Sequence, residues 1–269
     1  MKVAVIMGSP RKKDSFHLCK QLEQQINSHG EQIEFDYIFL SSLHIEDCKG
    51  CCLCFQKSET ACPCTGDDLD NVRQRLFSAD GVILASPVYA YQITGQLKRF
   101  IDRMSYQFHR QVMVGKPALI VVSTDGGGSK QVYNYLKMTL TGWGLDIVGN
   151  IQIISPMYYK NRTPKSVFKY NNHYYETNHK KLILLADKFF TRIHTFQKKS
   201  PTYYDIFMFN CLRSKTYTST VDRTYWEEKG WLERNYFYDI RLNPVKQLFG
   251  NLMRLLIHIA VLRYLKKHE

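Results

Sequence analysis

The sequence predicts an α/β fold in which helices cover both faces of a parallel sheet. Apolar segments of strand length alternate along the chain with amphipathic segments of helical length, which is the pattern of a doubly wound sheet. The first apolar segment, KVAVIMG at residues 2–8, is rich in β-branched residues and ends in glycine. Such a run is typical of a strand that is buried on both faces.

Four more strands follow the first. IEFDYIFL alternates apolar and polar residues, GVILASP is a continuous apolar run, and PALIVVSTDGGG runs into three glycines. LDIVGNIQII is the last. The five strands are expected at residues 2–8, 33–40, 81–87, 117–128 and 145–154.

The helices between these strands each place apolar residues on one face. In the first, Leu18, Leu22 and Ile26 recur at four-residue steps, and Gly30 can end the helix. The second begins with acidic residues, which are favourable at a helix N-terminus. We expect helices at residues 16–30, 66–80, 94–108, 129–144 and 176–196.

Composition sets the class of protein. The chain has 269 residues, of which 44% are hydrophobic, so it is globular material. The formal net charge of +13 comes without an arginine-rich arm, zinc-finger spacing or an RNA-binding motif, so we expect no nucleic-acid partner. The N-terminal apolar run is too short for a signal peptide, and no stretch has about 18 uncharged apolar residues. A cytoplasmic location is therefore expected.

The loop after the first strand is a candidate phosphate site. In parallel sheets of this kind, the loops after the first, third and fourth strands meet at the carboxyl edge, where ligands bind. GSPRKKDSF offers the hydroxyls of Ser9 and Ser15, the guanidinium of Arg11 and the free amides of a helix start. GxxxxGK[ST] and GxGxxG are both absent, which disfavours a nucleoside triphosphate or a dinucleotide bound in the usual mode. The alternative is an ordinary polar loop with an N-cap serine.

Three motifs carry a family resemblance. MKVAVIMGSPRKKDSFHL, CKGCCLC…CPCTGDD and ADGVILASPVYAYQITGQLKRFIDR occur in the order and spacing of the flavodoxin-like NAD(P)H-dependent FMN reductases. Within that family the chain most resembles the branch of the iron–sulfur flavoproteins. The resemblance implies a five-stranded flavodoxin-like sheet of strand order 2-1-3-4-5. It also implies an FMN-binding domain at residues 1–198, with residues 199–269 as a C-terminal extension.

By position, the resemblance implies that FMN lies against three loops. Compared with the common family loop GSPRKNGNT, this chain has KDSF as the last four residues, and Asp14 adds a negative charge. Tyr89 can stack on the isoalloxazine ring or only pack, and the glycines can admit the ring edge or form a flexible turn. No residue is assigned as proton donor, and Tyr89 and Tyr91 are the nearest candidates. The implied FMN contacts are Ser9, Arg11, Ser15, Phe16 and His17; Pro87, Val88, Tyr89 and Ala90; and Thr124, Asp125, Gly126, Gly127 and Gly128.

The segment at residues 47–66 holds six of the eight cysteines. In a reducing compartment, clustered cysteines more often bind metal or do redox chemistry than form disulfides. The iron–sulfur branch carries C-x2-C-x2-C followed by a fourth cysteine, which implies a [4Fe–4S] cluster. A thiol loop without a cluster is the alternative, and zinc fits the spacing less well. Cys52 and Cys64 are additional, and Cys64 could replace Cys62. The implied cluster ligands are Cys48, Cys51, Cys54 and Cys62.

Residues 199–269 are rich in aromatic side chains and end in a predicted helix at residues 244–269. We expect this extension to pack on the core or on a second subunit, giving a homo-oligomer (dimer or tetramer). Attachment of the final helix to an anionic membrane surface and docking of an electron-transfer protein are the alternatives. The helix has Leu248, Leu252, Leu255, Ile259 and Leu262 on one stripe, with Arg254, Arg263, Lys266 and Lys267 among its polar positions.

The resemblance implies an FMN-dependent oxidoreductase. Electrons would pass from NAD(P)H, or from ferredoxin if the cluster exists, to an acceptor such as a quinone. The alternative is an electron carrier without a small-molecule substrate, although the basic charge and the cysteine loop are unlike flavodoxins. A third hypothesis is a basic binding protein without enzymatic activity, since a fold alone does not decide function.

Overall fold

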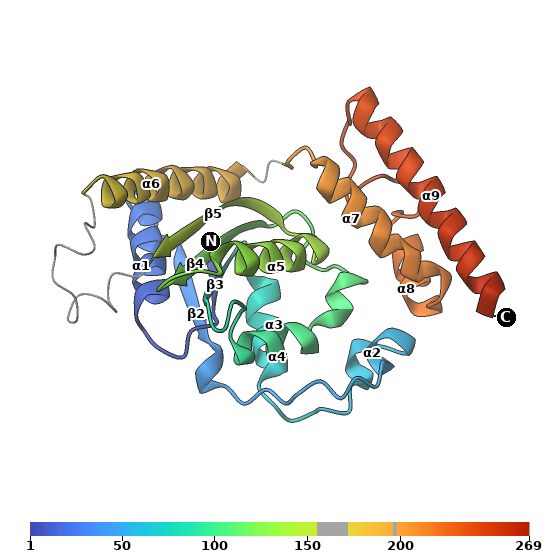
Figure 1. Ribbon diagram of the computed structural model, residues 1–269, viewed down its shortest axis with the longest axis horizontal. Coiled ribbons are helices and arrows are strands. Elements are labelled where there is room, and N and C mark those ends of the chain that lie inside the picture. Colours follow the sequence, from blue (N-terminus) through green and yellow to red (C-terminus); the bar gives the residue numbers. More distant parts are fainter. Residues whose placement is uncertain (155–171, 196–197, 269) are drawn as a thin grey trace.

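The computed structural model describes residues 1–154, 172–195 and 198–268 (Figure 1). Its centre is one five-stranded sheet in which every strand is parallel to its neighbours. The strand order is β2-β1-β3-β4-β5, which confirms the expected 2-1-3-4-5 arrangement. The strands are β1 (Lys2–Met7), β2 (Glu34–Phe39), β3 (Gly81–Pro87), β4 (Pro117–Thr124) and β5 (Asp146–Ile154).

Helices cover both faces of the sheet. One face packs against α1 (Asp14–Asn27) and α6 (Asn172–Thr195), whose apolar residues share a core with alternate residues of the strands. The other face packs against α3 (Leu69–Ser78), α4 (Gly95–Arg103) and α5 (Ser129–Gly142). The predicted stripe of Leu18, Leu22 and Ile26 is buried on α1, so the four-residue spacing identified its core face correctly.

The five core helices differ from their predicted ranges by a few residues, and two of them differ most at one end. The helix expected at residues 94–108 ends at Arg103, and a 3₁₀ turn, η3 (Ser105–Phe108), follows it. The amide of Met104 donates to the carbonyls of both Phe100 (3.0 Å) and Ile101 (3.1 Å), a tightening that is common at helix ends. The helix expected at residues 176–196 begins earlier, at Asn172, and the end of its predicted range lies outside the described residues.

The C-terminal extension is a separate group of helices beside the α/β core (Figure 1). It contains α7 (Tyr203–Arg213), the 3₁₀ turn η4 (Ser214–Tyr217), α8 (Thr220–Glu228) and α9 (Pro244–His268). An aromatic cluster holds it together and includes Phe209, Trp226, Trp231 and Phe237. Phe108 and Val114 of the core pack against the same cluster, so the extension packs on the core, as one of the expectations had it.

The last helix requires a correction to the sequence analysis. This helix contains charged residues, so the search for an uncharged apolar run did not predict it as a membrane-spanning segment. In the structure, however, Pro244–Lys267 form one helix that is long and apolar enough to cross a membrane by length and composition, and only 6% of its most apolar window is buried. The strict count of uncharged residues missed this helix, in which Lys246 and Arg254 are the only charged residues before Arg263.

Candidate functional site

The loops after β1 and β3 are bonded to each other at the carboxyl edge of the sheet. The amide of Gly8 donates to the carbonyl of Ala85 (2.8 Å). The carbonyl of Gly8 accepts hydrogen bonds from Thr94 Oγ1 (2.6 Å) and Gln96 Nε2 (2.9 Å). A Cβ at Gly8 would lie 2.9 Å from Leu97 Cδ2, so glycine is needed for this close approach.

The two serines of the first loop shape it from inside. The hydroxyl of Ser9 donates to the carbonyl of Arg11 (2.7 Å) and accepts from the amide of Arg11 (3.1 Å). The hydroxyl of Ser15 bonds that of Ser123 at the end of β4 (2.7 Å). Both Ser9 and Ser15 are buried. Their hydroxyls therefore stabilise the conformation of the loop. The basic side chains and the free backbone amides remain available to bind an anion.

The start of α1 is suited to a phosphate group. Lys13 occupies the N-cap position and, in the described structure, makes no side-chain capping hydrogen bond. The first amides of an uncapped helix point outward and carry the positive end of the helix dipole. Arg11, Lys12 and Lys13 are all exposed beside them. Asp14 is the one acidic residue in the first turn, so the local charge is positive overall.

Phe16 and His17, the last two residues of the implied phosphate loop, point to different surroundings. Phe16 is half-buried and packs edge-on against Tyr37, with ring centroids 5.4 Å apart, and against Phe39 at 5.7 Å. His17 is exposed. The Phe16 ring therefore anchors the helix start on β2, and its amide is the group that can meet the phosphate.

The loop after β3 forms a tight turn with an unusual backbone. Tyr89 and Gln92 exchange two backbone hydrogen bonds of 2.8 and 2.9 Å. The two residues between them, Ala90 (φ 47°) and Tyr91 (φ 61°), are both left-handed. Residues other than glycine rarely adopt this conformation, and they are enriched in tight turns and at functional sites. Pro87 ends β3, and the amide of Val88 donates to the carbonyl of Ser123 (2.8 Å), which ties this turn to β4.

The loop after β4 lies directly against that turn. Thr124 Oγ1 donates to the carbonyl of Gly127 (2.8 Å) and accepts from the amide of Gly126 (3.1 Å). A Cβ on Gly127 would lie 3.3 Å from the Tyr91 ring. Asp125 is exposed at the tip of the loop. All three implied flavin loops therefore meet at one edge of the sheet.

This edge fits FMN in its chemistry. The uncapped helix start and three basic side chains match a phosphate, and the space beside the backbone of Gly126 is open. Tyr89 is 39% exposed and Tyr91 65% exposed, so both aromatic faces are accessible for stacking.

Residues 1–160 match the family described as NADPH-dependent FMN reductase. The chain belongs to this family of oxidoreductases. The matching segment includes all three loops at the carboxyl edge and the whole cysteine segment.

Iron–sulfur flavoproteins are among the relatives of the chain. It is 36% identical over 151 residues to an iron–sulfur flavoprotein of Archaeoglobus fulgidus, covering 55% of this chain and 66% of the relative. It is 34% identical over 142 residues to an iron–sulfur flavoprotein of Methanocaldococcus jannaschii, covering 50% of this chain and 71% of the relative. The chain thus spans about two thirds of the length of each relative.

Two solved structures share the fold. RosB, solved with a bound intermediate, aligns with a TM-score of 0.55 at 12% identity, over 91% of this chain and 92% of RosB. A flavone reductase aligns with a TM-score of 0.52 at 15% identity, over 74% of this chain and 66% of its own. At these identities the likeness concerns the fold alone.

The cysteine segment surrounds a cavity of about 170 Å³. All eight cysteines of the chain lie in its described part and are free thiols. Burial, and then the neighbouring thiols of Cys48 and Cys62, raise the pKa of Cys54. Among the described residues no three Cys, His, Asp or Glu side chains converge as a metal site. The thiols around the cavity are those of Cys48, Cys51, Cys52, Cys54, Cys62 and Cys64.

Arg103 of α4 holds both ends of the cysteine segment. Its guanidinium donates to the carbonyls of Glu46 (3.1 Å) and Cys64 (2.9 Å) and pairs with the Asp67 carboxylate. Burial opposes ionisation of Asp67, but hydrogen bonds from the amides of Glu46 and Leu69, together with Arg103, lower its pKa. The segment is therefore a closed loop fastened at its base by a buried ion pair.

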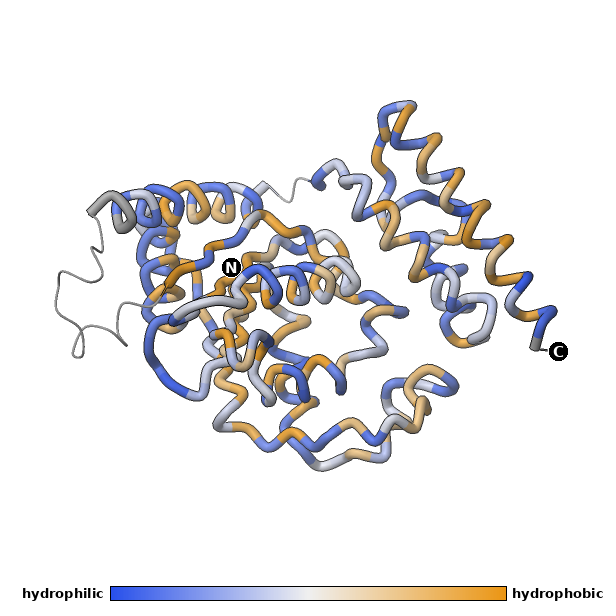
Figure 2. Tube along the Cα trace, viewed as in Figure 1, coloured by the Kyte–Doolittle hydropathy of each residue, from blue (hydrophilic) through white to orange (hydrophobic). Residues whose placement is uncertain are grey.

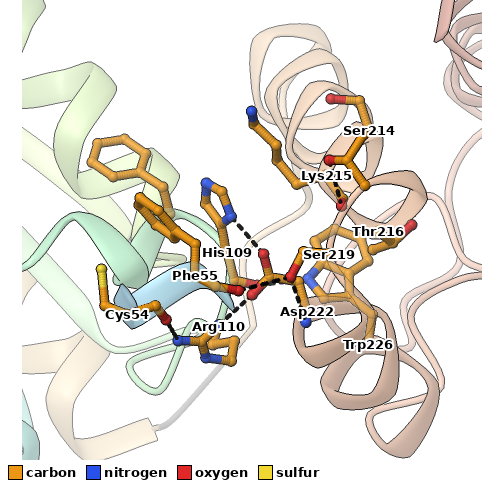
Figure 3. A network of polar contacts seen from close by, with 12 residues as sticks. Cys54, Phe55, His109, Arg110, Ser214, Lys215, Thr216, Ser219, Asp222 and Trp226 are labelled. Carbon is orange, nitrogen blue, oxygen red and sulfur yellow. Dashed lines mark hydrogen bonds and ion pairs between the residues drawn. The ribbon is translucent and has the colours of Figure 1, made fainter. Parts of the chain in front are cut away.

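A second network fastens the tip of the segment to the C-terminal extension (Figure 3). Arg110 pairs with Asp222 of α8 and donates to the carbonyl of Cys54. His109 Nδ1 also bonds Asp222 (2.8 Å), and the His109 ring stacks on Phe55 with centroids 4.5 Å apart. The hydroxyl of Ser219 donates to the carbonyl of Phe55 (2.9 Å). The cysteine segment thus lies between the α/β core and the extension.

Arg103, Arg110 and Asp222 were not predicted from the sequence. One signal was available for Arg103, which interrupts the apolar positions of a strongly amphipathic helix and is buried with Phe100 and Ile101. Arg110 and Asp222 are far apart in the chain, and the sequence around them holds no motif that would pair them.

Proposed function

We propose that the protein is an FMN-dependent oxidoreductase that takes electrons from NAD(P)H and passes them to an acceptor such as a quinone. The observation that carries the proposal is the meeting of three loops at the carboxyl edge of the sheet, beside the basic, uncapped start of α1. Membership of the NADPH-dependent FMN reductase family supports the same reading.

The chain would bind and orient the flavin. Arg11 and the amides at the start of α1 would hold the phosphate through charge-assisted hydrogen bonds. The turn at residues 89–92 and the glycine loop at residues 126–128 would position the ring. Bound FMN would supply the hydride and single-electron chemistry. Tyr91 covers one side of the glycine loop and would limit the access of water to the ring from that side.

We propose further that the cysteine segment holds a [4Fe–4S] cluster through Cys48, Cys51, Cys54 and Cys62. Cysteine thiolates are the usual ligands of such clusters. All four thiols line one cavity. The names of the Archaeoglobus and Methanocaldococcus relatives also support it. In the described residues the thiols do not yet converge, so loading would require the segment to close around the cluster. The free thiols also support the cytoplasmic location proposed from the sequence.

One purification under anaerobic conditions tests both parts. Flavin, iron and acid-labile sulfide are measured on the same sample, and the oxidation of NADH and NADPH is followed with a quinone as acceptor. We expect about one FMN with about four irons and four sulfides per chain, and rapid pyridine nucleotide oxidation. Slow oxidation combined with fast exchange with ferredoxin would instead identify an electron carrier.

Variants separate the cluster from the flavin. Cys54→Ser should remove iron and sulfide and leave the flavin bound. Cys211→Ser, in the extension and away from the cavity, is the matched control and should retain both. Flavin without iron in the unaltered protein would reject the cluster and keep the FMN reductase. A protein with neither group after reconstitution with FMN would reject the whole proposal.

A further inference from the structure

The exposed side of α9 is apolar over most of its length. Six Leu and Ile side chains, defined here as the outer stripe, are each between 36% and 70% exposed. At 100° per residue they lie within an arc of about 120° on the helix. Figure 1 places α9 at the outer edge of the molecule, with α7 between it and the core, and Figure 2 shows hydrophobic residues recurring along it. The outer stripe consists of Leu248, Leu252, Leu255, Leu256, Ile259 and Leu262.

The side of α9 that faces the protein is mixed: Phe249, Met253 and Ile257 are partly buried there beside polar residues. Arg254 pairs with Glu233 (3.3 Å), and His258 Nδ1 bonds the hydroxyl of Tyr217 (2.8 Å). Asn251 accepts a hydrogen bond from the side-chain amide of Asn235 (2.8 Å). An amphipathic surface helix normally buries its apolar side and exposes its polar side. In α9 apolar residues lie on both sides, so the outer stripe is left uncovered by the described chain.

The basic residues on and beside α9 indicate what kind of surface covers the outer stripe. Residues 244–268 contain five Lys or Arg and no Asp or Glu. Arg263, Lys266 and Lys267 gather at the end of the stripe. A cavity of about 550 Å³ beside α9 is lined by Arg213, Arg223 and Arg254, together with Glu233, and contains Leu255 of the stripe. An apolar strip bordered by cationic groups is complementary to a surface that is apolar inside and anionic at its rim.

We propose that α9 lies in the plane of an anionic lipid membrane and attaches the protein to it. The outer stripe enters the acyl region, while Arg263, Lys266 and Lys267 meet lipid phosphates. A second copy of the chain fits less well, because pairing two α9 helices brings together two sets of five positive charges, of which only Arg254 has an acidic partner in the described residues. This proposal is independent of the proposed enzymatic function.

The same contacts argue that α9 lies on the membrane and does not cross it. Arg254 is near the middle of the helix, and its guanidinium is held by Glu233 of the extension. Crossing would break that pair and the bonds of Asn251 and His258, and would place an arginine at the centre of the bilayer. A helix in the interface keeps all three contacts.

Flotation of the full-length protein with vesicles tests this attachment. One set contains phosphatidylglycerol and phosphatidylcholine, and the other contains phosphatidylcholine alone. We expect the protein to float with the anionic vesicles and to stay in solution with the neutral ones. Replacing Arg263, Lys266 and Lys267 together by Gln should weaken the partition on the order of a hundredfold, since each charge contributes about 1 kcal/mol near such a surface.

Substitutions in the outer stripe test the apolar part. Leu252→Glu combined with Leu256→Glu should reduce flotation at least about tenfold. Leu184→Glu is the matched control, since Leu184 is 59% exposed on α6, and it should float like the unaltered protein. Near-ultraviolet circular dichroism checks that each variant is folded.

Three outcomes would overturn the proposal. The unaltered protein could fail to float with anionic vesicles. It could sediment as a dimer that the double Glu variant converts to a monomer without any vesicle binding, which would identify a second copy as the occupant. Finally, it could resist release from vesicles by high salt and alkaline carbonate, which would identify a spanning helix.

Discussion

Arg110 of the core and Asp222 of the extension form an ion pair in which the side chains are 7% and 1% exposed. The same guanidinium donates to the carbonyl of Cys54. The tip of the cysteine segment, the turn after α4 and the start of α8 are therefore fastened at one point (Figure 3). This arrangement makes the extension a structural support of the cysteine segment.

Removing the charge of Asp222 should destabilise the protein. Asp222→Asn leaves the buried Arg110 with only the partly exposed Glu59 (3.4 Å) as an acidic partner, and breaking a buried pair typically costs about 3–5 kcal/mol. We expect a loss of about 3 kcal/mol in the free energy of unfolding, measured by chemical denaturation. Asp239→Asn is the control, since Asp239 is exposed in the same extension and should change stability by less than about 0.5 kcal/mol. Equal stability of both variants would show that the pair is not structural.

Acid should release this contact. Burial opposes ionisation of Asp222, but the hydrogen bond from His109 and the charge of Arg110 lower its pKa below the ordinary value of about 3.9. A lowered carboxyl pKa contributes stability that is complete above about pH 4 and is lost as the pH falls through the folded-state value. Fluorescence of Trp226 and Trp231, both in the aromatic cluster, should report the loss. In Asp222→Asn this acid-dependent step should be absent.

Of the glycines in the flavin loops, Gly128 should tolerate substitution least. Its φ is +85°, and an added Cβ would lie 2.7 Å from Val88 Cγ1 and 3.1 Å from the Cα of Tyr91. Gly128→Ala should therefore cost at least about 2 kcal/mol in stability and weaken FMN binding. Gly126→Ala is the control, because nothing lies within 4 Å of its added Cβ. Equal affinities of the two variants for FMN would contradict the role given to the close packing around Gly128.

Arg11 should hold the flavin phosphate. A hydrogen bond to a charged group contributes about 1.5–3 kcal/mol, so Arg11→Gln should raise the Kd for FMN roughly 10- to 100-fold. Lys180→Gln, an exposed change on α6, should leave the Kd unaltered. Fluorescence quenching of FMN during titration measures both values. An unchanged Kd for Arg11→Gln would place the phosphate elsewhere.

The sequence was sufficient for the sheet because the information was local. Each strand was a short apolar or alternating run and each core helix carried a periodic stripe, as Leu18, Leu22 and Ile26 show. The end of α4 at Arg103 was not predictable, because buried apolar positions continue through Met104 into the 3₁₀ turn η3. The orientation of α9 was also hidden: its stripe was evident from the spacing, but only the packing shows that the stripe faces outward.

The candidate site, too, was predictable from the sequence only in part. The positions of the three loops followed from motif order, and their meeting follows from the topology of a parallel sheet. The left-handed backbone at Ala90 and Tyr91 could not be foreseen, because neither residue favours it and no glycine marks the turn. The Ser15–Ser123 bond joins residues of two distant loops, and only the fold brings them together.

Titration of the apoprotein with FMN and with riboflavin tests the central claim most directly. The two ligands share the ring and differ in the phosphate that we assign to Arg11 and the start of α1. We predict that one FMN binds per chain and that riboflavin binds at least about 100-fold more weakly. Equal affinities, or no binding of either flavin, would contradict the site described here.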